Sequence, residues 1–215
     1  MSKKELSPKV TALYQAVVSF FGEGADMSCI TVAEIAARAG IGKGTVYEYF
    51  SNKEEMIAGA LYNSMQQLCE KLREKICQQA TLYDKMMQIL FTMEEQMKDG
   101  SSFLHLLHIK ESSSEIGRRM KEIIEEQKEE KDFIGDVFYE MLEAEADPSM
   151  RQDEDGITYL AMMVFSRVIC YVMYMGECTG QPGRQPERIR ELICQGICDD
   201  VNNYKERKSW ESAIL

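Results

Sequence analysis

The chain has 215 residues, of which 45% are hydrophobic and 28% charged, a composition typical of a globular protein and not of a disordered one. Its formal net charge of -11 is opposite to the basic surface with which most DNA-binding proteins neutralise phosphate. The 7 cysteines follow no framework spacing, so free thiols in a reducing compartment are expected in place of disulfides. The N-terminal stretch MSKKELSPKV has no apolar run that could form a signal peptide, which favours a cytoplasmic protein.

The first forty residues predict two helices whose N-terminal caps can be identified in the sequence. Ser7 is a suitable N-cap for the first helix, because its hydroxyl can accept from a free backbone amide, and Pro8 fits the first turn. Gly22 is expected to end that helix. Thr31 would cap the second helix, and Glu34 stands three residues later, where a capping box requires a carboxylate.

The stretch GIGKGTVYEYFSNKEEM, residues 40–56, follows the second helix and predicts a helix-turn-helix. Gly40 is expected to adopt the positive φ of the turn. Ala36 is small because the two helices cross there, and Val46 fills the space between them. A third helix over about 43–50 would offer its N-terminal end to the major groove of DNA.

The rest of the chain continues the helical period, and its sequence contains no credible alternating strand pattern. A long fourth helix is expected to begin after Asn52. Further helices are predicted near 82–98, 102–110, 115–145, 153–178 and 186–204. The sequence therefore predicts an all-α protein of about nine helices, with a three-helix head at 1–52 and a larger helical body at 53–215.

The acidity is distributed unevenly along the chain. Residues 1–55 carry six Lys and Arg against seven Asp and Glu, whereas residues 56–215 carry nineteen against twenty-nine. Between residues 38 and 53, three basic side chains stand against one acidic side chain. Such a patch can neutralise phosphate, while an acidic body discourages indiscriminate contact with DNA.

One segment is long and apolar enough to require a test against a membrane span. Residues 157–175 read ITYLAMMVFSRVICYVMYM, with Arg167 near the middle. A central arginine costs ~2.5–3.5 kcal/mol on insertion scales. A helix that is apolar nearly all round is also typical of the core of a soluble protein, so a buried helix and no membrane contact are predicted.

The stretch TVAEIAARAGIGKGTVYEYFSNKEEM resembles the N-terminal signature of the tetracycline-repressor (TetR) family of bacterial transcription regulators. The resemblance is close over about residues 8–57 and extends to the remainder only in length and helix number. It implies an all-helical homodimer with a three-helix DNA-binding head and a divergent ligand-binding body. Most members repress transcription at a palindromic operator and leave the DNA when a small molecule binds.

The resemblance assigns DNA contacts to seven residues: Thr31, Lys43, Gly44, Thr45, Tyr47, Tyr49 and Lys53. Lysine can reach guanine edges or phosphate, and a tyrosine hydroxyl can bond phosphate without adding charge. The alternative for both tyrosines is packing within the head. Gly42 stands where many members have a serine, so a hydroxyl contact to phosphate is missing. Glu48 either accepts from a cytosine amino group or faces the solvent, and the solvent is favoured.

Dimerisation is predicted for the last two helices. The nearly all-apolar helix at 157–175 must bury two faces, and the last helix carries an apolar stripe in which a glycine permits close approach. The predicted interface comprises Val164, Val168, Val172, Ile189, Ile193, Gly196 and Ile197. Two-fold symmetry would place two recognition helices about 34 Å apart, one turn of DNA.

A pocket for an unknown small-molecule ligand is expected in the body from the family resemblance. The 15 methionines suit an adaptable apolar cavity, and a polar break in the helix at 115–145 offers a second indication. The candidate lining residues are Met86, Met93, Phe103, Gln127, Met163, Tyr171 and Tyr174. The alternative for these side chains is ordinary core packing.

Two further groups of residues are candidates for metal or redox sites. His105 and His108 share a helix face and could bind a metal ion together with Glu111. Cys194 and Cys198 are one turn apart and, with Cys170 or Cys178, could form a redox or soft-metal sensor, but buried free thiols and no metal are favoured. The sequence contains no phosphate loop, nucleophile elbow or pair of catalytic carboxylates, so neither an enzyme nor a cofactor is predicted. The alternative to a DNA-binding regulator is a helical ligand- or protein-binding module that no longer reads DNA.

Overall fold

The computed structural model describes residues 6–98, 115–126, 133–178 and 185–214, and its regular elements over these residues are all helices. The predicted all-α class is confirmed. The chain divides into two compact units, residues 1–67 with 96–130 and residues 68–95 with 131–215. The helix α4 (Lys53–Cys77) runs from the first unit into the second. The boundary expected after residue 52 stays a prediction.

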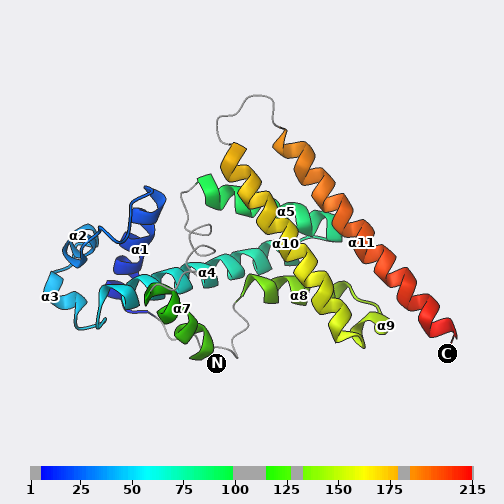
Figure 1. The fold of residues 1–215 in the computed structure, drawn as a ribbon, viewed down its shortest axis with the longest axis horizontal. Coiled ribbons are helices and arrows are strands. Elements are labelled where there is room, and N and C mark those ends of the chain that lie inside the picture. Colours follow the sequence, from blue (N-terminus) through cyan, green and yellow to red (C-terminus); the bar gives the residue numbers. More distant parts are fainter. Residues whose placement is uncertain (1–5, 99–114, 127–132, 179–184, 215) are drawn as a thin grey trace. The chain divides into compact units, whose positions relative to one another are not determined.

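The first unit contains the predicted three-helix head, drawn in blue and cyan in Figure 1. The head consists of α1 (Pro8–Gly22), α2 (Val32–Arg38) and α3 (Lys43–Val46). The first unit also contains the first part of α4, and α7 (Glu115–Glu126). The Ser7 hydroxyl accepts from the amide of Val10 at 3.3 Å, which confirms the predicted N-cap of α1. Three side chains with at most 1% exposure, Leu13, Ile35 and Val46, hold α1, α2 and α3 in one core. This core fixes the orientation of α3.

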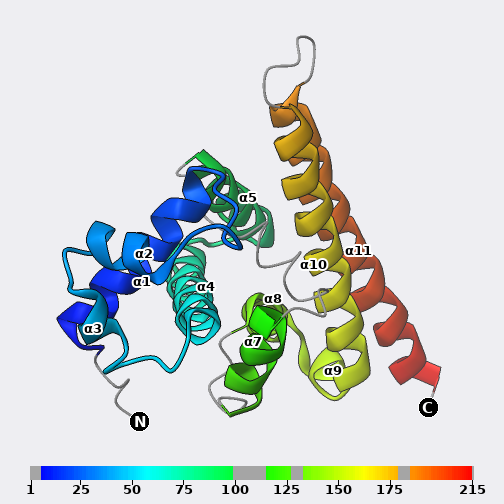
Figure 2. The ribbon, with the colours of Figure 1, turned by 60° about the vertical axis from the view of Figure 1, so that its left-hand side comes forward.

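The second unit is centred on α10 (Figures 1 and 2). Its helices are the end of α4, most of α5 (Leu82–Lys98), α8 (Ile134–Glu145), α9 (Pro148–Arg151), α10 (Glu154–Cys178) and α11 (Pro186–Ile214). The α10 helix packs along α8 and α11. Phe138 of α8 is fully buried and lies against Phe165 of α10, with 6.3 Å between ring centroids.

The helix predicted over 115–145 is wrong as a single element. The structure has two helices, because Phe133 adopts an extended conformation (φ -97, ψ 151) and its amide donates to the Asp136 carboxylate at 3.0 Å. This contact begins α8. The polar break noted in the sequence of 115–145 precedes α8. The helix expected at 102–110 falls outside the described residues.

The short α9 lies between the helices predicted at 115–145 and 153–178, where the sequence predicts no helix. The Asp147 carboxylate accepts from the amide of Met150 at 3.0 Å and so starts a turn of helix within the connection. The last helix continues to Ile214, well past the end expected near residue 204.

The α10 helix is long and apolar enough over Glu154–Gly176 to cross a membrane by length and composition alone, with a mean hydropathy of 1.6. Its apolar side chains Val164 and Val168 have no exposed surface within the second unit. Arg167, in the middle of the helix, pairs with Asp200 of α11. One face of α10 therefore lies in the core of the second unit.

Candidate nucleic-acid interface

The turn between α2 and α3 has the geometry of a Schellman motif. Gly40 adopts φ +68, the left-handed conformation predicted for it. The amide of Ile41 donates to the carbonyl of Ala36 at 2.9 Å, and the amide of Gly40 donates to Ala37 at 3.1 Å. These two bonds satisfy the last carbonyls of α2 and turn the chain sharply into α3.

The start of α2 is fixed by the predicted capping box. The amide of Glu34 donates to the Thr31 hydroxyl at 3.2 Å, and the amide of Thr31 donates to the Glu34 carboxylate at 2.8 Å. The Thr31 hydroxyl also donates to this carboxylate, at 2.7 Å. This bond, together with the one from the Thr31 amide, lowers the pKa of Glu34 below its ordinary value, because both stabilise the carboxylate. The Thr31 side chain is exposed at the helix end, where the predicted phosphate contact requires it.

The recognition helix is shorter than the predicted 43–50. Regular α-helix covers Lys43–Val46, and the amides of Tyr47, Glu48 and Tyr49 donate to carbonyls only three residues earlier, at 3.1–3.2 Å. Such bonds form a tighter 3₁₀-type turn, which carries the chain to the buried Phe50. Gly42 is the N-cap and supplies no side-chain hydrogen bond, as expected from the missing serine.

The outer face of this segment is available to a groove. Lys43 and Gly44 are exposed, Thr45 is half-buried, and Tyr47 and Tyr49 are 52% and 39% exposed. Both tyrosines therefore direct much of their surface to solvent, although packing was an alternative for them. Glu48 is exposed as well, in agreement with the favoured solvent position. The DNA contacts themselves stay predictions.

Lys53 lies in a different environment from the one expected. Its ammonium nitrogen donates to the carbonyl oxygens of Met27 at 3.0 Å, Ser28 at 3.2 Å and Ile30 at 3.0 Å. An ammonium has three N–H donors, so these carbonyls occupy all of them. The sequence contained no signal for this contact, because the carbonyls belong to a loop more than twenty residues away.

The Arg38 side chain also makes contacts within the head. Its guanidinium donates to the Ser19 hydroxyl at 2.9 Å and pairs with Glu23 at 2.7 Å, and its central carbon lies 3.5 Å from the centroid of the Phe20 ring. The side chain thus joins α2 to the end of α1. Of the three basic residues between positions 38 and 53, Arg38 and Lys43 are exposed and Lys53 is half-buried.

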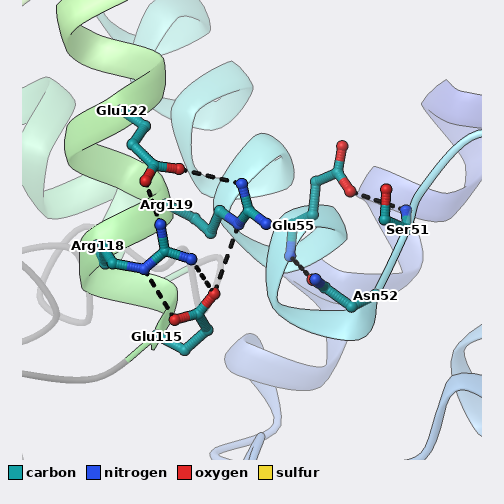
Figure 3. A network of polar contacts seen from close by, with 7 residues as sticks. All are labelled: Ser51, Asn52, Glu55, Glu115, Arg118, Arg119 and Glu122. Carbon is teal, nitrogen blue, oxygen red and sulfur yellow. Dashed lines mark hydrogen bonds and ion pairs between the residues drawn. The ribbon is translucent and has the colours of Figure 1, made fainter.

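The first turn of α4 is capped by its own side chains. The amide of Glu55 donates to the Asn52 side chain at 2.7 Å, and the Glu55 carboxylate accepts from the amide of Ser51 at 2.8 Å. Figure 3 draws this cap together with a charge cluster on α7, in which Arg118 and Arg119 pair with glutamates of the same helix. The predicted start of the fourth helix after Asn52 is confirmed.

The candidate pocket residues of the body include buried side chains, half-buried side chains and two residues that the structure does not describe. Met86, Met93 and Tyr171 are at most 1% exposed, Met163 and Tyr174 are half-buried, and Phe103 and Gln127 lie outside the described residues. The Tyr171 hydroxyl donates to Glu94, which also pairs with Arg190 of α11. Burial raises the pKa of Tyr171 well above its ordinary value. This buried polar cluster had no sequence signal.

The residues predicted for the dimer interface fall into two groups. Val164, Val168, Val172 and Ile197 are at most 1% exposed within the chain, while Ile189, Ile193 and Gly196 are half-buried. The first four side chains are therefore part of the core of the second unit, in place of the predicted dimer interface. Large exposed apolar side chains lie elsewhere on the same helices, at Tyr159, Met162 and Met173 of α10 and Leu192 of α11.

The cysteines on α11 do not have the environment of reactive thiols. Burial raises the pKa of Cys194 to about 12 and also raises the pKa of Cys198. A thiolate is the reactive form, so a raised pKa disfavours redox sensing at these two positions. Within the described residues no group of three His, Cys, Asp or Glu could hold a metal ion, and His105, His108 and Glu111 lie outside them.

A short helix with an exposed leading edge, held by a glycine turn behind a capped helix, defines a helix-turn-helix DNA-binding protein. The model of the family described as bacterial regulatory proteins, tetR family, matches residues 26–60, which span α2, the turn, α3 and the start of α4. Residues 26–60 therefore carry the DNA-binding region that is typical of this family of transcriptional regulators.

A curated relative is the fatty acid metabolism regulator protein of Bacillus subtilis (strain 168), 27% identical over 124 residues, or 56% of this chain. The alignment spans 63% of that relative's length. Among solved structures, the fatty acid degradation regulator FadR from Bacillus halodurans has a TM-score of 0.62 at 19% identity, covering 90% of this chain and 96% of its own. FadR from Bacillus subtilis in complex with stearoyl-CoA has a TM-score of 0.59 at 18% identity, covering 89% and 96%. At these identities the structural likeness shows the fold.

Proposed function

We propose that the protein is a homodimeric repressor that binds a palindromic operator and is released from it by a long-chain acyl-CoA. The observation that carries the DNA-binding part is the exposed face of α3, fixed by the left-handed Gly40 and by the buried Val46. A recognition helix requires this combination, because its outer side chains must reach base edges while its inner face stays anchored. As a DNA-binding regulator the protein would act in the cytoplasm.

The apolar surface of α10 supports a second copy of the chain as the partner. Tyr159, Met162 and Met173 are 61%, 65% and 53% exposed. At 3.6 residues per turn they fall within roughly 60° of one another around the helix axis. Leu192 on the neighbouring α11 is 50% exposed. Paired two-fold, these faces would form a four-helix interface and place two heads on a palindrome.

The class of ligand is inferred from the relatives and is consistent with the second unit. The named relatives regulate fatty acid metabolism or degradation, and one of them is in complex with stearoyl-CoA. In this chain Met86 and Met93 lie two turns apart on α5, fully buried with Leu90 between them. Flexible methionines can move to admit an acyl chain.

A cleft of about 300 Å³ between α1 and α4 in the first unit is a less suitable site for that chain. Its lining is rich in hydroxyl and amide groups, supplied by Thr11, Tyr14, Gln15, Val18, Ser19, Asn63, Ser64 and Gln67. An acyl chain there would bury polar groups without partners, which costs free energy. We therefore place the acyl chain in the second unit.

Release from DNA requires that the ligand prefer one conformation over another. The α4 helix begins beside the helix-turn-helix and ends in the second unit, so it is one of the covalent connections between the two units. A change from mostly bound to mostly free needs a preference of about 5.5 kcal/mol for the released state. An acyl chain of many buried methylenes can supply this, at about 0.8 kcal/mol each.

Selection of bound duplexes from a random DNA pool, at two salt concentrations, tests the DNA-binding proposal. We expect a palindrome whose half-sites lie about one helical turn apart. Lys43→Ala and Thr45→Ala should weaken binding and alter the preferred bases at the positions that they read. Absence of any enriched sequence, with weak binding that vanishes as the salt concentration rises, would contradict the proposal.

The second candidate is a helical module that binds a ligand or protein without reading DNA. It is favoured by the engagement of Arg38 and Lys53 in internal contacts and by the exposed Glu48, which reduce the positive charge that residues 38–53 offer to phosphate. The same selection experiment separates the two candidates.

A further inference from the structure

The contact between Lys53 and three backbone carbonyls joins two segments that are distant in sequence. Lys53 is the first residue of α4, and the carbonyls of Met27, Ser28 and Ile30 belong to the loop that connects α1 with α2. Ile30 directly precedes Thr31, the N-cap of α2. The ammonium therefore lies between the start of the helix-turn-helix and the start of α4.

The loop is arranged around this charge. The Asp26 carboxylate accepts from the amide of Ser28 at 2.9 Å and from the Cys29 thiol at 3.6 Å, and the amide of Cys29 donates to the Asp26 carbonyl at 3.0 Å. The hydrogen bonds from Ser28 lower the pKa of Asp26, and the positive charge of Lys53 adds to this effect. The Met27 side chain is 6% exposed, so the loop is also anchored where the carbonyls begin.

We propose that Lys53 is a positioning residue for DNA binding: its ammonium ties the loop at 27–30, and with it α2, to the first turn of α4. This assignment replaces the expected direct contact of Lys53 with phosphate, and it rests on the proposed function of the chain as a DNA-binding regulator. A movement of the N-terminal end of α4 is then passed to the helix-turn-helix through three hydrogen bonds. Moving the ammonium to a phosphate would break these bonds and leave the three carbonyls without their donor.

Arginine is a sharp probe of this assignment because it keeps the charge and changes the geometry. The guanidinium is a planar fork that suits phosphate, whereas a compact ammonium can direct three N–H groups at three carbonyls around one point. A phosphate-binding residue should therefore tolerate Lys53→Arg, and a loop-tying residue should not. Lys53→Met removes the charge and all three donors while keeping an unbranched side chain.

Hydrogen exchange of the DNA-free protein is the first test, with Lys9→Met as control, since Lys9 is an exposed lysine of the same unit. In Lys53→Met and Lys53→Arg the amides of Cys29 and Thr31 should exchange at least about tenfold faster, because the loop opens locally more often. The amides of α1 and the control variant should be unchanged. Unchanged exchange at Cys29 and Thr31 in both Lys53 variants would overturn the proposal.

The salt dependence of operator affinity is the second test. Both Lys53 variants should lose at least about tenfold in affinity for every duplex, while the slope of log affinity against log salt stays as in the wild type. A lost phosphate contact would instead flatten that slope by about one per contact, and Lys53→Arg would then bind as the wild type does. That second pattern would overturn the proposal. If wild-type protein binds no duplex, the proposed function fails, and the exchange experiment still decides the role of Lys53.

Discussion

At the residue scale, the head depends on individual contacts that only the three-dimensional structure reveals. The types of residue at Thr31, Glu34 and Gly40 are diagnostic in the sequence, because capping and positive φ require particular side chains over three or four positions. The pairing of Arg38 with Ser19 and Glu23, and of Lys53 with the loop carbonyls, joins residues far apart in the chain. A basic side chain near a DNA-binding motif is as compatible with a phosphate contact as with an internal contact. Its actual partner could therefore not be predicted from the sequence.

Gly59 illustrates a residue whose small size has a specific cause. A Cβ added to Gly59 would overlap the Tyr14 side chain of α1, whose ring packs on Phe50 at 5.8 Å between centroids. Gly59→Ala should therefore destabilise the protein by about 1–3 kcal/mol, although alanine is the better helix former. Thermal unfolding measures this, with an expected fall in Tm of about 2–4 °C per kcal/mol.

The matched control is Gly135→Ala in α8. Nothing lies within 4 Å of a Cβ at that position, so the intrinsic preference of a helix for alanine should dominate there. We expect Gly135→Ala to raise Tm slightly. If Gly59→Ala also raised Tm, the contact between Tyr14 and Gly59 would not constrain the packing of α1 against α4.

At the element scale, the sequence predicted where helices begin better than how far they extend. The Ser7 and Thr31 caps and the start of α4 after Asn52 carry local chemistry, and all three are confirmed. The division of 115–145 into α7 and α8 depends on an extended Phe133, a residue with no preference for helix ends. The shortness of α3 has a similar origin, because the turn after Val46 is tightened by packing of Phe50 and not by a breaker residue.

The turn between α2 and α3 gives a prediction at this scale. Gly40 adopts φ +68, with no atom within 4 Å of an added Cβ, so any cost of substitution comes from the backbone conformation. Gly40→Ala should lose about 1–2 kcal/mol of stability, while Gly40→Asn should lose less because asparagine tolerates the left-handed region. Chemical denaturation of both variants measures the difference. Equal stability of Gly40→Ala and the wild type would contradict the assigned turn geometry.

At the scale of the whole molecule, the sequence predicts that the last two helices form a dimer, but it does not predict which of their apolar faces are exposed. Periodicity identifies the apolar positions of α10, yet it does not say which of them meet α8 and α11 inside the subunit. Val164, Val168 and Val172 proved to be core, and the exposed set includes Tyr159, Met162 and Met173. A nearly all-apolar helix has no polar face from which the orientation could be deduced.

The proposed dimer predicts that a charge on this exposed face separates the subunits. Met162 is 65% exposed, so Met162→Glu should leave the monomer fold intact while placing a desolvated carboxylate in the two-fold interface. Sedimentation velocity should show a monomer, and operator affinity should fall because two heads no longer bind together. Gln78→Glu, an equal charge change at an exposed position in the turn after α4, should remain dimeric. A dimeric Met162→Glu protein would place the interface elsewhere.

The central claim joins DNA binding in the head to an acyl-CoA in the body, and one titration tests it most directly. Stearoyl-CoA is added to the protein bound to its selected palindrome, and the fraction of bound duplex is followed by fluorescence anisotropy, with free CoA as control. We predict release by stearoyl-CoA and no release by CoA at equal concentration, because the buried acyl chain supplies the preference for the released state. A complex that stays intact at saturating stearoyl-CoA, with ligand binding confirmed on the same protein, would contradict the coupling.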